Sequence, residues 1–211
     1  MQKLPTKIHD AFLLKPKVFG DARGFFLESW NKKTFLELVG DFDFVQDNHS
    51  RSSKHVLRGL HYQSGDTAQG KLVWVTAGTV YDVLVDLRKS SPTYGQWDGY
   101  YLTADAHERL WVPPGCAHGF LVVSDTADFH YKVTSLYSPK DERALRWDDP
   151  HLAMYSKIPF GSIFAISGHK LSFLVSLGSP PMSSDFSESL AGECACFSRC
   201  NNCRPVLRQV P

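Results

Sequence analysis

The sequence has almost no excess of either charge, because 23 Lys and Arg residues are balanced by 22 Asp and Glu residues, for a formal net charge of +1. A chain without a strong overall field does not attract nucleic acid or an anionic membrane, so local charges must hold any anionic ligand. The sequence also lacks an apolar run long enough to cross a bilayer, and no signal-peptide apolar region follows Met1. We therefore expect a soluble cytoplasmic protein with no nucleic-acid and no membrane partner.

Cysteine is nearly absent from the first three quarters of the chain, where only Cys116 occurs. The other four thiols, Cys194, Cys196, Cys200 and Cys203, form a C-x-C-x3-C-x2-C cluster near the end. This spacing matches no common structural zinc site well, and no secretory signal supports disulfides. A zinc site in this cluster stays open as the less favoured alternative.

Hydrophobic residues make up 43% of the chain, and from about Ile8 to Trp147 they form short β-branched runs separated by turn residues. The only helix predicted here is Thr34–Val39, preceded by Asn31, and Ala77-Gly78-Thr79 is typical of a hairpin turn. Many short strands at this spacing predict an all-β sandwich or closed barrel, whose interior is a ready ligand cavity. The expected strands are Lys17–Phe19, Gly24–Trp30, Phe44–Arg51, Val56–Gln63, Lys71–Val75, Val80–Asp86, Tyr100–Thr103, Arg109–Val112, His118–Ser124 and Phe129–Tyr137.

The composition changes after about Tyr155, where the chain becomes rich in serine and poor in charge. We place the boundary between Pro150 and Pro159. The expected organisation is a β domain over residues 1–155 and a divergent tail of unknown structure over residues 156–211.

The segment Arg58-Gly59-Leu60-His61-Tyr62-Gln63 carries a guanidinium, an imidazole and a carboxamide, and Lys71 follows on the next expected strand. This combination predicts an anion-binding site that contains a base, and His61 is the candidate because imidazole titrates near neutral pH. Strand alternation puts His61 and Gln63 on one face and Arg58 on the other. A bulge at Gly59 would bring Arg58 into the same cavity.

The segment Pro113-Pro114-Gly115-Cys116-Ala117-His118 contains Pro-x-Gly-x-x-His, which is half of the metal-binding pattern of cupins. The other half of that pattern is His-x-His followed by Glu, whereas this chain has His61-Tyr62-Gln63 and then Lys71. An amide in place of an imidazole removes a ligand, and an ammonium nearby repels a cation. A site without a metal is therefore favoured.

Further polar residues lie on other expected strands. Tyr131 shares a strand face with Phe129 and Val133, so it is either a core residue or a proton donor to the cavity. Tyr137 is the second candidate for such a donor. Four more residues, each also explicable as a solvated edge residue, together resemble the lining of a nucleotide site: Arg23, Glu28, Gln46 and Asn48.

Taken in order, the motifs closely resemble the dTDP-4-dehydrorhamnose 3,5-epimerase family over about Phe19 to Pro150. The motifs are Arg23-Gly24-x-Phe26-x-Glu28, Gln46-Asp47-Asn48-x-Ser50, Arg58-Gly59-Leu60-His61-Tyr62-Gln63, Lys71-Leu72-Val73, Asp82-Val83-x-Val85-Asp86-Leu87-Arg88, Ser91-Pro92-Thr93-Tyr94-Gly95, Pro114-x-x-x-His118-Gly119-Phe120 and Tyr131-Lys132-x-Thr134-x-x-Tyr137-Ser138-Pro139. The resemblance implies a cupin-type jelly roll without metal or cofactor, working as a homodimer in deoxysugar nucleotide biosynthesis. It also implies the substrate dTDP-4-dehydro-6-deoxy-D-glucose and the product dTDP-4-dehydro-L-rhamnose.

The resemblance also implies roles for the residues. His61 would remove protons next to the C4 ketone, Tyr131 would return a proton from the opposite face, and Lys71 would stabilise the enolate oxygen. Guanidinium groups suit phosphate oxygens. The implied substrate contacts are Arg23 and Arg58 at the diphosphate, Glu28, Gln46 and Asn48 at the thymidine, and His118, Tyr137 and Glu142 elsewhere in the pocket.

The chain departs from the family where a carboxylate that orients the catalytic histidine is expected. At that place it reads Ile166-Ser167-Gly168-His169-Lys170, which keeps the serine and lacks the acid. Asp82, on a neighbouring expected strand, is a candidate substitute. Two alternatives stay open: an enzyme that epimerises one centre or isomerises the ketone of a related dTDP-sugar, and a catalytically impaired sugar-nucleotide binding protein. A metal-dependent cupin oxygenase is least favoured.

Overall fold

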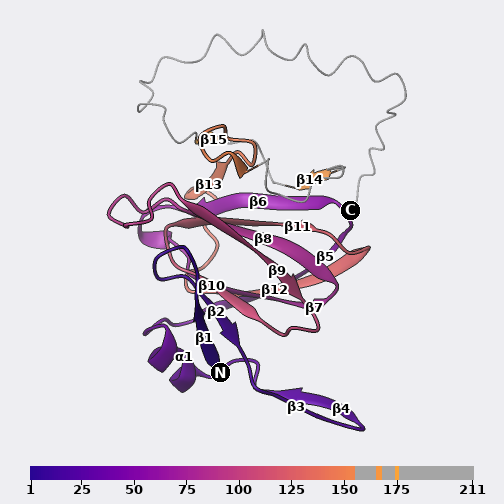
Figure 1. Cartoon of the computed structure of the whole chain (residues 1–211). Coiled ribbons are helices and arrows are strands. Elements are labelled where there is room, and N and C mark those ends of the chain that lie inside the picture. Colours follow the sequence, from indigo (N-terminus) through magenta and orange to yellow (C-terminus); the bar gives the residue numbers. More distant parts are fainter. Residues whose placement is uncertain (155–164, 168–173, 176–211) are drawn as a thin grey trace, which may run out of the picture. The chain divides into compact units, whose positions relative to one another are not determined.

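Two sheets face each other in the computed structural model, which describes residues 1–154, 165–167 and 174–175 (Figure 1). The first sheet has the order β1 (Gln2–Pro5), β2 (Phe12–Lys15), β10 (Arg109–Val112), β7 (Lys71–Ala77), β12 (Thr126–Val133) and β5 (Gln46–Ser53). The second has the order β15 (Leu174–Val175), β13 (Glu142–Leu145), β6 (Val56–Gln63), β11 (Cys116–Val122), β8 (Thr79–Asp86) and β9 (Trp97–Thr103), with β14 (Ala165–Ser167) beside β6. The all-β prediction is confirmed.

Apolar side chains from both sheets meet between them. The buried residues there include Val73, Leu84, Leu110, Phe120 and Phe129. Since inward and outward side chains alternate along each strand, the same strands can also present polar groups to the interior. The core fills only part of the space between the sheets, and the remainder is the pocket described below.

The helix α1 (Lys32–Leu38) covers the outer face of the first sheet. Its N-cap is Asn31, whose side chain accepts a hydrogen bond from the Thr34 backbone N–H, as expected for this residue type. Phe35 is buried against Trp111, with ring centroids 5.3 Å apart. The predicted helix is therefore confirmed, with its start two residues earlier than expected. A short 3₁₀ turn, η1 (Gly65–Thr67), lies between β6 and β7.

The hairpin of β3 (Val18–Asp21) and β4 (Gly24–Leu27) projects from the two sheets (Figure 1). Phe19, Phe25 and Phe26 on this hairpin are more than half exposed, at 52%, 64% and 70%. Exposed aromatic residues at this density are typical of an interaction surface.

One expected connection is wrong. Ala77-Gly78-Thr79 does not close a hairpin, because β7 pairs with β10 and β12 in the first sheet while β8 pairs with β9 and β11 in the second. The chain instead crosses from one sheet to the other at Gly78. Gly78 has φ +75°, and a Cβ there would lie 2.0 Å from the Thr126 carbonyl oxygen, so only glycine fits this crossing.

The expected strands otherwise differ from the observed ones at their ends, and β1, β2 and β13 were not predicted. The expected strand Phe129–Tyr137 ends at Val133, and Gly24–Trp30 ends at Leu27. Strands of four residues carry too short an apolar pattern to be identified with certainty from the sequence.

Two short strands lie beyond the expected domain boundary at residue 155. β14 runs parallel to β6, with Ile166 opposite Leu57 and Ser167 opposite Arg58, and β15 runs parallel to β13. The segment in which the family acid is missing therefore begins alongside β6. The boundary itself stays a prediction, because residues 155–164, 168–173 and 176–211, including the cysteine cluster, lie outside the described residues.

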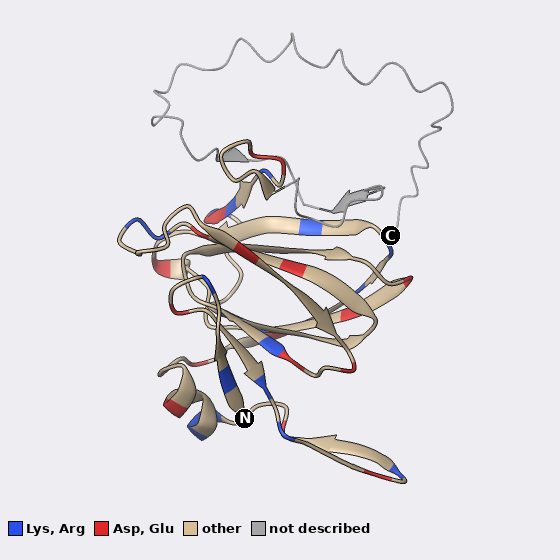
Figure 2. Ribbon diagram, in the orientation of Figure 1, with Lys and Arg blue, Asp and Glu red and all other residues tan. Residues whose placement is uncertain are grey.

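Charges of both signs are interspersed along the ribbon, in agreement with the balanced composition (Figure 2). In the part of the chain that the structure describes, no helix has the length and hydrophobicity needed to span a bilayer.

Candidate active site

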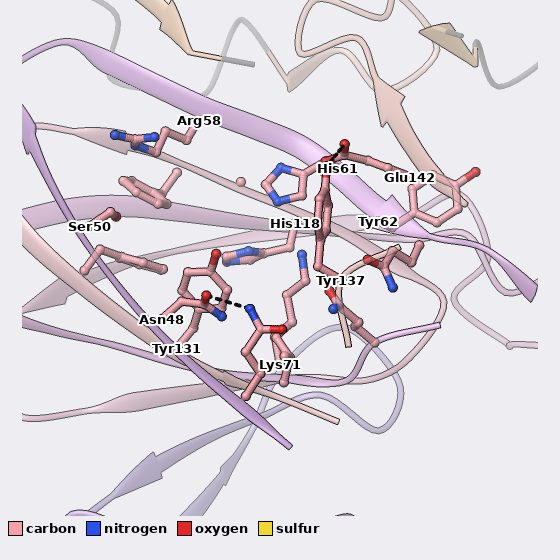
Figure 3. Close-up of a pocket in the computed structure, with 17 residues that line it drawn as sticks. Asn48, Ser50, Arg58, His61, Tyr62, Lys71, His118, Tyr131, Tyr137 and Glu142 are labelled. Carbon is pink, nitrogen blue, oxygen red and sulfur yellow. Dashed lines mark hydrogen bonds between the residues drawn. The ribbon is translucent and has the colours of Figure 1, made fainter. Parts of the chain in front are cut away.

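A cavity of about 370 Å³ opens between the two sheets, within the size range of small-molecule sites (Figure 3). Side chains from β5, β7 and β12 line one wall, and side chains from β6, β11 and β13 line the other. The lining residues are Gln46, Asn48, Ser50, Arg58, His61, Tyr62, Gln63, Gln69, Lys71, His118, Gly119, Phe120, Phe129, Tyr131, Val133, Tyr137 and Glu142. All the predicted site residues lie there except Asp82, Arg23 and Glu28.

A bulge in β6 brings Arg58 and His61 into the same cavity, as the sequence predicted. His118 on β11 pairs with His61, but Phe120 pairs with Arg58, so β6 has one residue more than β11 over this stretch. Gly59 has φ +96°, and a Cβ there would lie 2.5 Å from the His118 carbonyl oxygen. The bulge therefore requires glycine, and it turns Arg58 toward the pocket.

His61 faces a positively charged surrounding. The Lys71 ammonium lowers the pKa of His61 well below its ordinary value, and burial, His118 and Arg58 act in the same direction. The imidazole is therefore neutral at neutral pH and has a lone pair available, as a general base requires. Within residues 1–154 no side chain holds the His61 ring by a hydrogen bond.

Lys71 is almost fully buried, with 3% of its surface exposed. Burial lowers its pKa to about 8, while the Glu142 and Asp82 carboxylates partly oppose this shift. The structure shows no hydrogen bond or ion pair of the Lys71 ammonium with the described residues. A desolvated cation without a fixed partner can bind an anionic oxygen that appears in the pocket.

Asp82 is the predicted substitute for the missing partner of His61, but in the structure it contacts His118 instead. Both of its carboxylate oxygens lie within hydrogen-bond distance of His118 Nε2, at 2.9 and 3.0 Å, and both residues are buried. The reason is the sheet order, because β11 lies between β8 and β6 and separates Asp82 from His61. Burial raises the pKa of Asp82, whereas His118 and then Lys71 act to lower it. Asp82 therefore orients His118, which itself lines the pocket.

Tyr131 lies across the cavity from β6, on the same face of β12 as Phe129 and Val133 (Figure 3). Burial raises the pKa of the Tyr131 phenol, so it keeps its proton at neutral pH. Tyr131 lines the cavity and also packs against the core, and its role as a proton donor stays a prediction. Tyr131 is available as a proton donor.

The neighbouring strand β5 contributes amide groups. Gln46 and Asn48 point into the pocket two residues apart, and the Gln46 amide donates to Asn48 Oδ1 at 2.8 Å. Ser50 continues the same face. Arg58 Nε donates a hydrogen bond to the Ser52 hydroxyl at 2.9 Å, which helps to orient the guanidinium group.

The mouth of the pocket carries Tyr137 and Glu142. The Tyr137 hydroxyl donates to Glu142 Oε2 at 2.8 Å, and this bond raises the pKa of the phenol. Half of the Tyr137 surface is exposed, so the ring is accessible to a ligand that enters.

Arg23 and Glu28 do not line this pocket within one chain, and their contacts with the substrate stay a prediction. Arg23 is on the turn of the projecting hairpin and forms an ion pair with Asp21, with 2.7 Å between Nη2 and Oδ2. Glu28 follows β4 and accepts a hydrogen bond from the Asn31 side chain at 3.1 Å. The sequence pattern identifies these residues but does not show that the hairpin projects away from the pocket.

A family model described as dTDP-4-dehydrorhamnose 3,5-epimerase matches residues 5–169 of the chain. The chain belongs to this family. The match extends the resemblance seen in the sequence into β14. One curated relative, the dTDP-4-dehydrorhamnose 3,5-epimerase of Salmonella typhimurium, is 52% identical over 160 residues, which cover 74% of this chain and 87% of the relative.

Solved structures of family members agree with the fold. An epimerase from Legionella pneumophila in complex with dTDP-4-keto-L-rhamnose has 48% identity and a TM-score of 0.75, covering 79% of this chain and 87% of that one. A 3'-monoepimerase from Streptomyces bikiniensis in complex with dTDP-quinovose has 29% identity and a TM-score of 0.70, covering 76% and 82%. The cupin-type jelly roll is thereby confirmed.

Sequence reasoning missed several residues that shape the pocket. Ser50 and Phe129 could have been found by strand alternation, because they share faces with Asn48 and Tyr131. The sequence places Gln63 on the cavity face with His61, but it does not show that this side chain is 3% exposed and makes three hydrogen bonds. Its partners belong to distant segments, so no local pattern reports them. Among the described residues no group of three His, Cys, Asp or Glu could hold a metal ion, and catalysis without a metal stays a prediction.

Proposed function

We propose that this chain inverts C3 and C5 of dTDP-4-dehydro-6-deoxy-D-glucose to give dTDP-4-dehydro-L-rhamnose. The observation that carries the proposal is a neutral imidazole, a protonated phenol and a buried ammonium in one pocket, from His61, Tyr131 and Lys71. The similarity to a family member that binds dTDP-4-keto-L-rhamnose supports the same substrate class. We further propose that the reaction takes place in the cytoplasm and needs no cofactor.

The C4 ketone makes the hydrogens on C3 and C5 acidic, because the carbanion is delocalised onto the ketone oxygen. His61 takes one of these protons, the C–H electron pair forms the enolate double bond, and the negative charge develops on the C4 oxygen. The Lys71 ammonium stabilises that oxygen in surroundings with little water to compete. Tyr131 then donates its proton to the opposite face of the carbon, which inverts the centre and restores the ketone. Proton exchange with solvent returns His61 to the neutral imidazole and Tyr131 to the phenol.

The nucleotide end of the substrate requires cation and amide contacts. We assign the diphosphate to Arg58, whose guanidinium can form bidentate bonds with phosphate oxygens. Gln46 and Asn48 present donors and acceptors to the thymidine part. Three more side chains complete the pocket, namely His118, Tyr137 and Glu142. We assign Asp82 an indirect role, in which it fixes the tautomer and the ring position of His118.

We propose that the enzyme is a homodimer in which the β3–β4 hairpin of one copy reaches the pocket of the other. Three phenylalanines on this hairpin are exposed, and Arg23 and Glu28 lie on it or next to it, away from their own pocket. Burial of the aromatic rings against a second copy supplies a driving force for association. Arg23 would then join Arg58 of the partner subunit at the diphosphate.

Mixing two weakly active variants tests this arrangement. Arg23→Ala removes the hairpin contact and His61→Asn removes the base, so each variant alone is expected to be weakly active. In a mixed dimer with exchanged hairpins one site has both functional residues, so mixing should restore up to roughly a quarter of the wild-type rate. Sedimentation velocity measures whether the protein is a dimer in solution. A monomer, or a mixture no more active than its components, would contradict the proposal.

Deuterium exchange tests the function itself. The wild-type protein is incubated with dTDP-4-dehydro-6-deoxy-D-glucose in deuterated water, and label at C3 and C5 is followed by NMR. We expect label at both carbons and formation of the L-rhamno product. Label at C3 alone would indicate a mono-epimerase, the alternative favoured by the similarity to a 3'-monoepimerase. Binding of dTDP without any exchange would indicate an impaired binding protein.

A further inference from the structure

The carboxamide of Gln63 makes three hydrogen bonds from a fully buried position. Its Nε2 donates to the Thr67 carbonyl at 2.7 Å and to the Leu136 carbonyl at 3.1 Å. Its Oε1 accepts from the Ser138 backbone N–H at 2.9 Å. Leu136 and Ser138 are the two neighbours of Tyr137, so one side chain holds the backbone on both sides of the tyrosine at the pocket mouth.

Other bonds tie the same segment, residues 134–141, here called the mouth loop, to residues 64–70. The Asp141 carboxylate accepts from the Ser138 hydroxyl at 2.6 Å and from the Thr67 hydroxyl at 3.0 Å. The Gln69 amide donates to the Ser135 carbonyl at 2.7 Å. These contacts fix the base of the mouth loop, but among the described residues only the Gln63 side chain forms hydrogen bonds with both residues that flank Tyr137.

The side chain of Tyr137 makes few contacts that would fix the position of its ring. The residue is 51% exposed, and within the described residues its side chain forms one hydrogen bond, to Glu142. The position of the ring over the pocket therefore depends on the backbone beneath it. A ring that is already in place when a planar base arrives does not lose conformational freedom on binding.

We propose that Gln63 is a positioning residue for nucleotide binding, which acts by holding Tyr137 at the pocket mouth. It occupies the place where a metal cupin has the second histidine of His-x-His, and here the amide serves as a tether for the mouth loop. The inference rests on the proposed function, since it assumes that the ligand at Tyr137 is the nucleotide part of a dTDP-sugar. It assigns Gln63 no contact with the reacting carbons.

A double-mutant cycle with Gln63→Met and Tyr137→Ala tests the proposal. Met keeps the volume of the buried side chain and removes all three hydrogen bonds. We expect KM and the dTDP dissociation constant to rise about tenfold in Gln63→Met, with kcat within about threefold of wild type. In the Tyr137→Ala background the same substitution should leave KM and dTDP binding unchanged, because the residue that it positions is gone.

Ser124→Ala is the matched control for loss of structural hydrogen bonds. Its hydroxyl forms hydrogen bonds with the Thr79 N–H and the Thr126 carbonyl at a turn outside the pocket, so this variant should lose stability and keep its KM. If Gln63→Met does not fold, Asp141→Ala replaces it in the cycle, because it loosens the same loop from a partly exposed position. Effects that add in the cycle, or a fall in kcat with KM unchanged, would overturn the proposal.

Hydrogen exchange separates the failure of this inference from failure of the proposed function. The Ser138 amide proton, bonded to Gln63 Oε1, should be protected in the ligand-free wild type and should exchange at least tenfold faster in Gln63→Met. If the wild type neither binds dTDP nor exchanges deuterium into the sugar, the proposed function is wrong, and the role in nucleotide binding is wrong with it. An unprotected Ser138 amide in an active wild type would overturn the tether alone.

Discussion

His61→Asn is expected to lower deuterium exchange at C3 and C5 of dTDP-4-dehydro-6-deoxy-D-glucose by about 10²–10⁴-fold, the usual contribution of a general base. Asparagine keeps the polarity of the site but cannot accept the substrate proton. Affinity for dTDP should stay within a few-fold of wild type, because Arg58, Gln46 and Asn48 are unchanged. NMR follows the exchange, and calorimetry measures the affinity.

Two further variants make this result specific. Tyr131→Phe removes the proposed acid but keeps the ring and its packing, so product formation should slow by about 10²–10⁴-fold while the fold survives. His9→Asn replaces an exposed histidine on a distant loop and should leave all rates unchanged. Exchange at the wild-type rate in His61→Asn would place the base elsewhere, and unaltered product formation in Tyr131→Phe would leave Tyr131 as a core residue.

Lys71→Met is expected to lose about 10²–10³-fold in kcat, as on removal of a group that stabilises an oxyanion, and yet to be more stable than wild type at neutral pH. The gain arises because burial of the ammonium lowers its pKa from 10.5 to about 8, which means that the charged form is disfavoured in the folded protein. Methionine fills similar space without a charge. Removing this cost should stabilise the fold by roughly 1–3 kcal/mol.

The stability difference between Lys71→Met and wild type should depend on pH. Below pH about 8 the buried ammonium is charged and lowers stability, whereas above the ordinary pKa of 10.5 it is neutral in both the folded and the unfolded state. The advantage of Lys71→Met should therefore be full at pH 7 and decline between pH 8 and 10.5. Denaturant titrations at several pH values measure it, with the exposed Lys33→Met as control. A variant less stable than wild type at pH 7 would contradict this account.

Much of the site could be predicted from the sequence because it follows strand alternation. Gln46 and Asn48, or Phe129 and Tyr131, lie two residues apart on one strand face, and the structure places both pairs in the pocket. The bulge at Gly59 was also predictable, because Arg58 and His61 could share a cavity only if one residue was added between them. In these cases the information lies within a few residues of sequence.

What could not be predicted depends on which segments meet. Ala77-Gly78-Thr79 resembles a hairpin turn locally, and only the pairing of β7 and β8 with other strands shows that it is a crossing. Asp82 was assigned to His61 because the order β6-β11-β8 within the sheet cannot be read from the sequence. The motif that contains Arg23 likewise does not show that the β3–β4 hairpin projects away from the pocket of its own chain.

The crossing at Gly78 has a consequence for how the chain acquires its structure. Since the strands on either side of it enter different sheets, the walls of the pocket form only by distant pairings, such as Gln46 with Val133 and His61 with His118. Non-local pairings of this kind are slow to form, because the loop-closure entropy must be overcome before the contacts stabilise the chain. His61, Lys71 and Tyr131 come from three strands that belong to two different sheets, so we expect the three groups to come together only when both sheets have formed. Recovery of epimerase activity after denaturation thus reports completion of both sheets, whereas recovery of β-sheet circular dichroism alone does not.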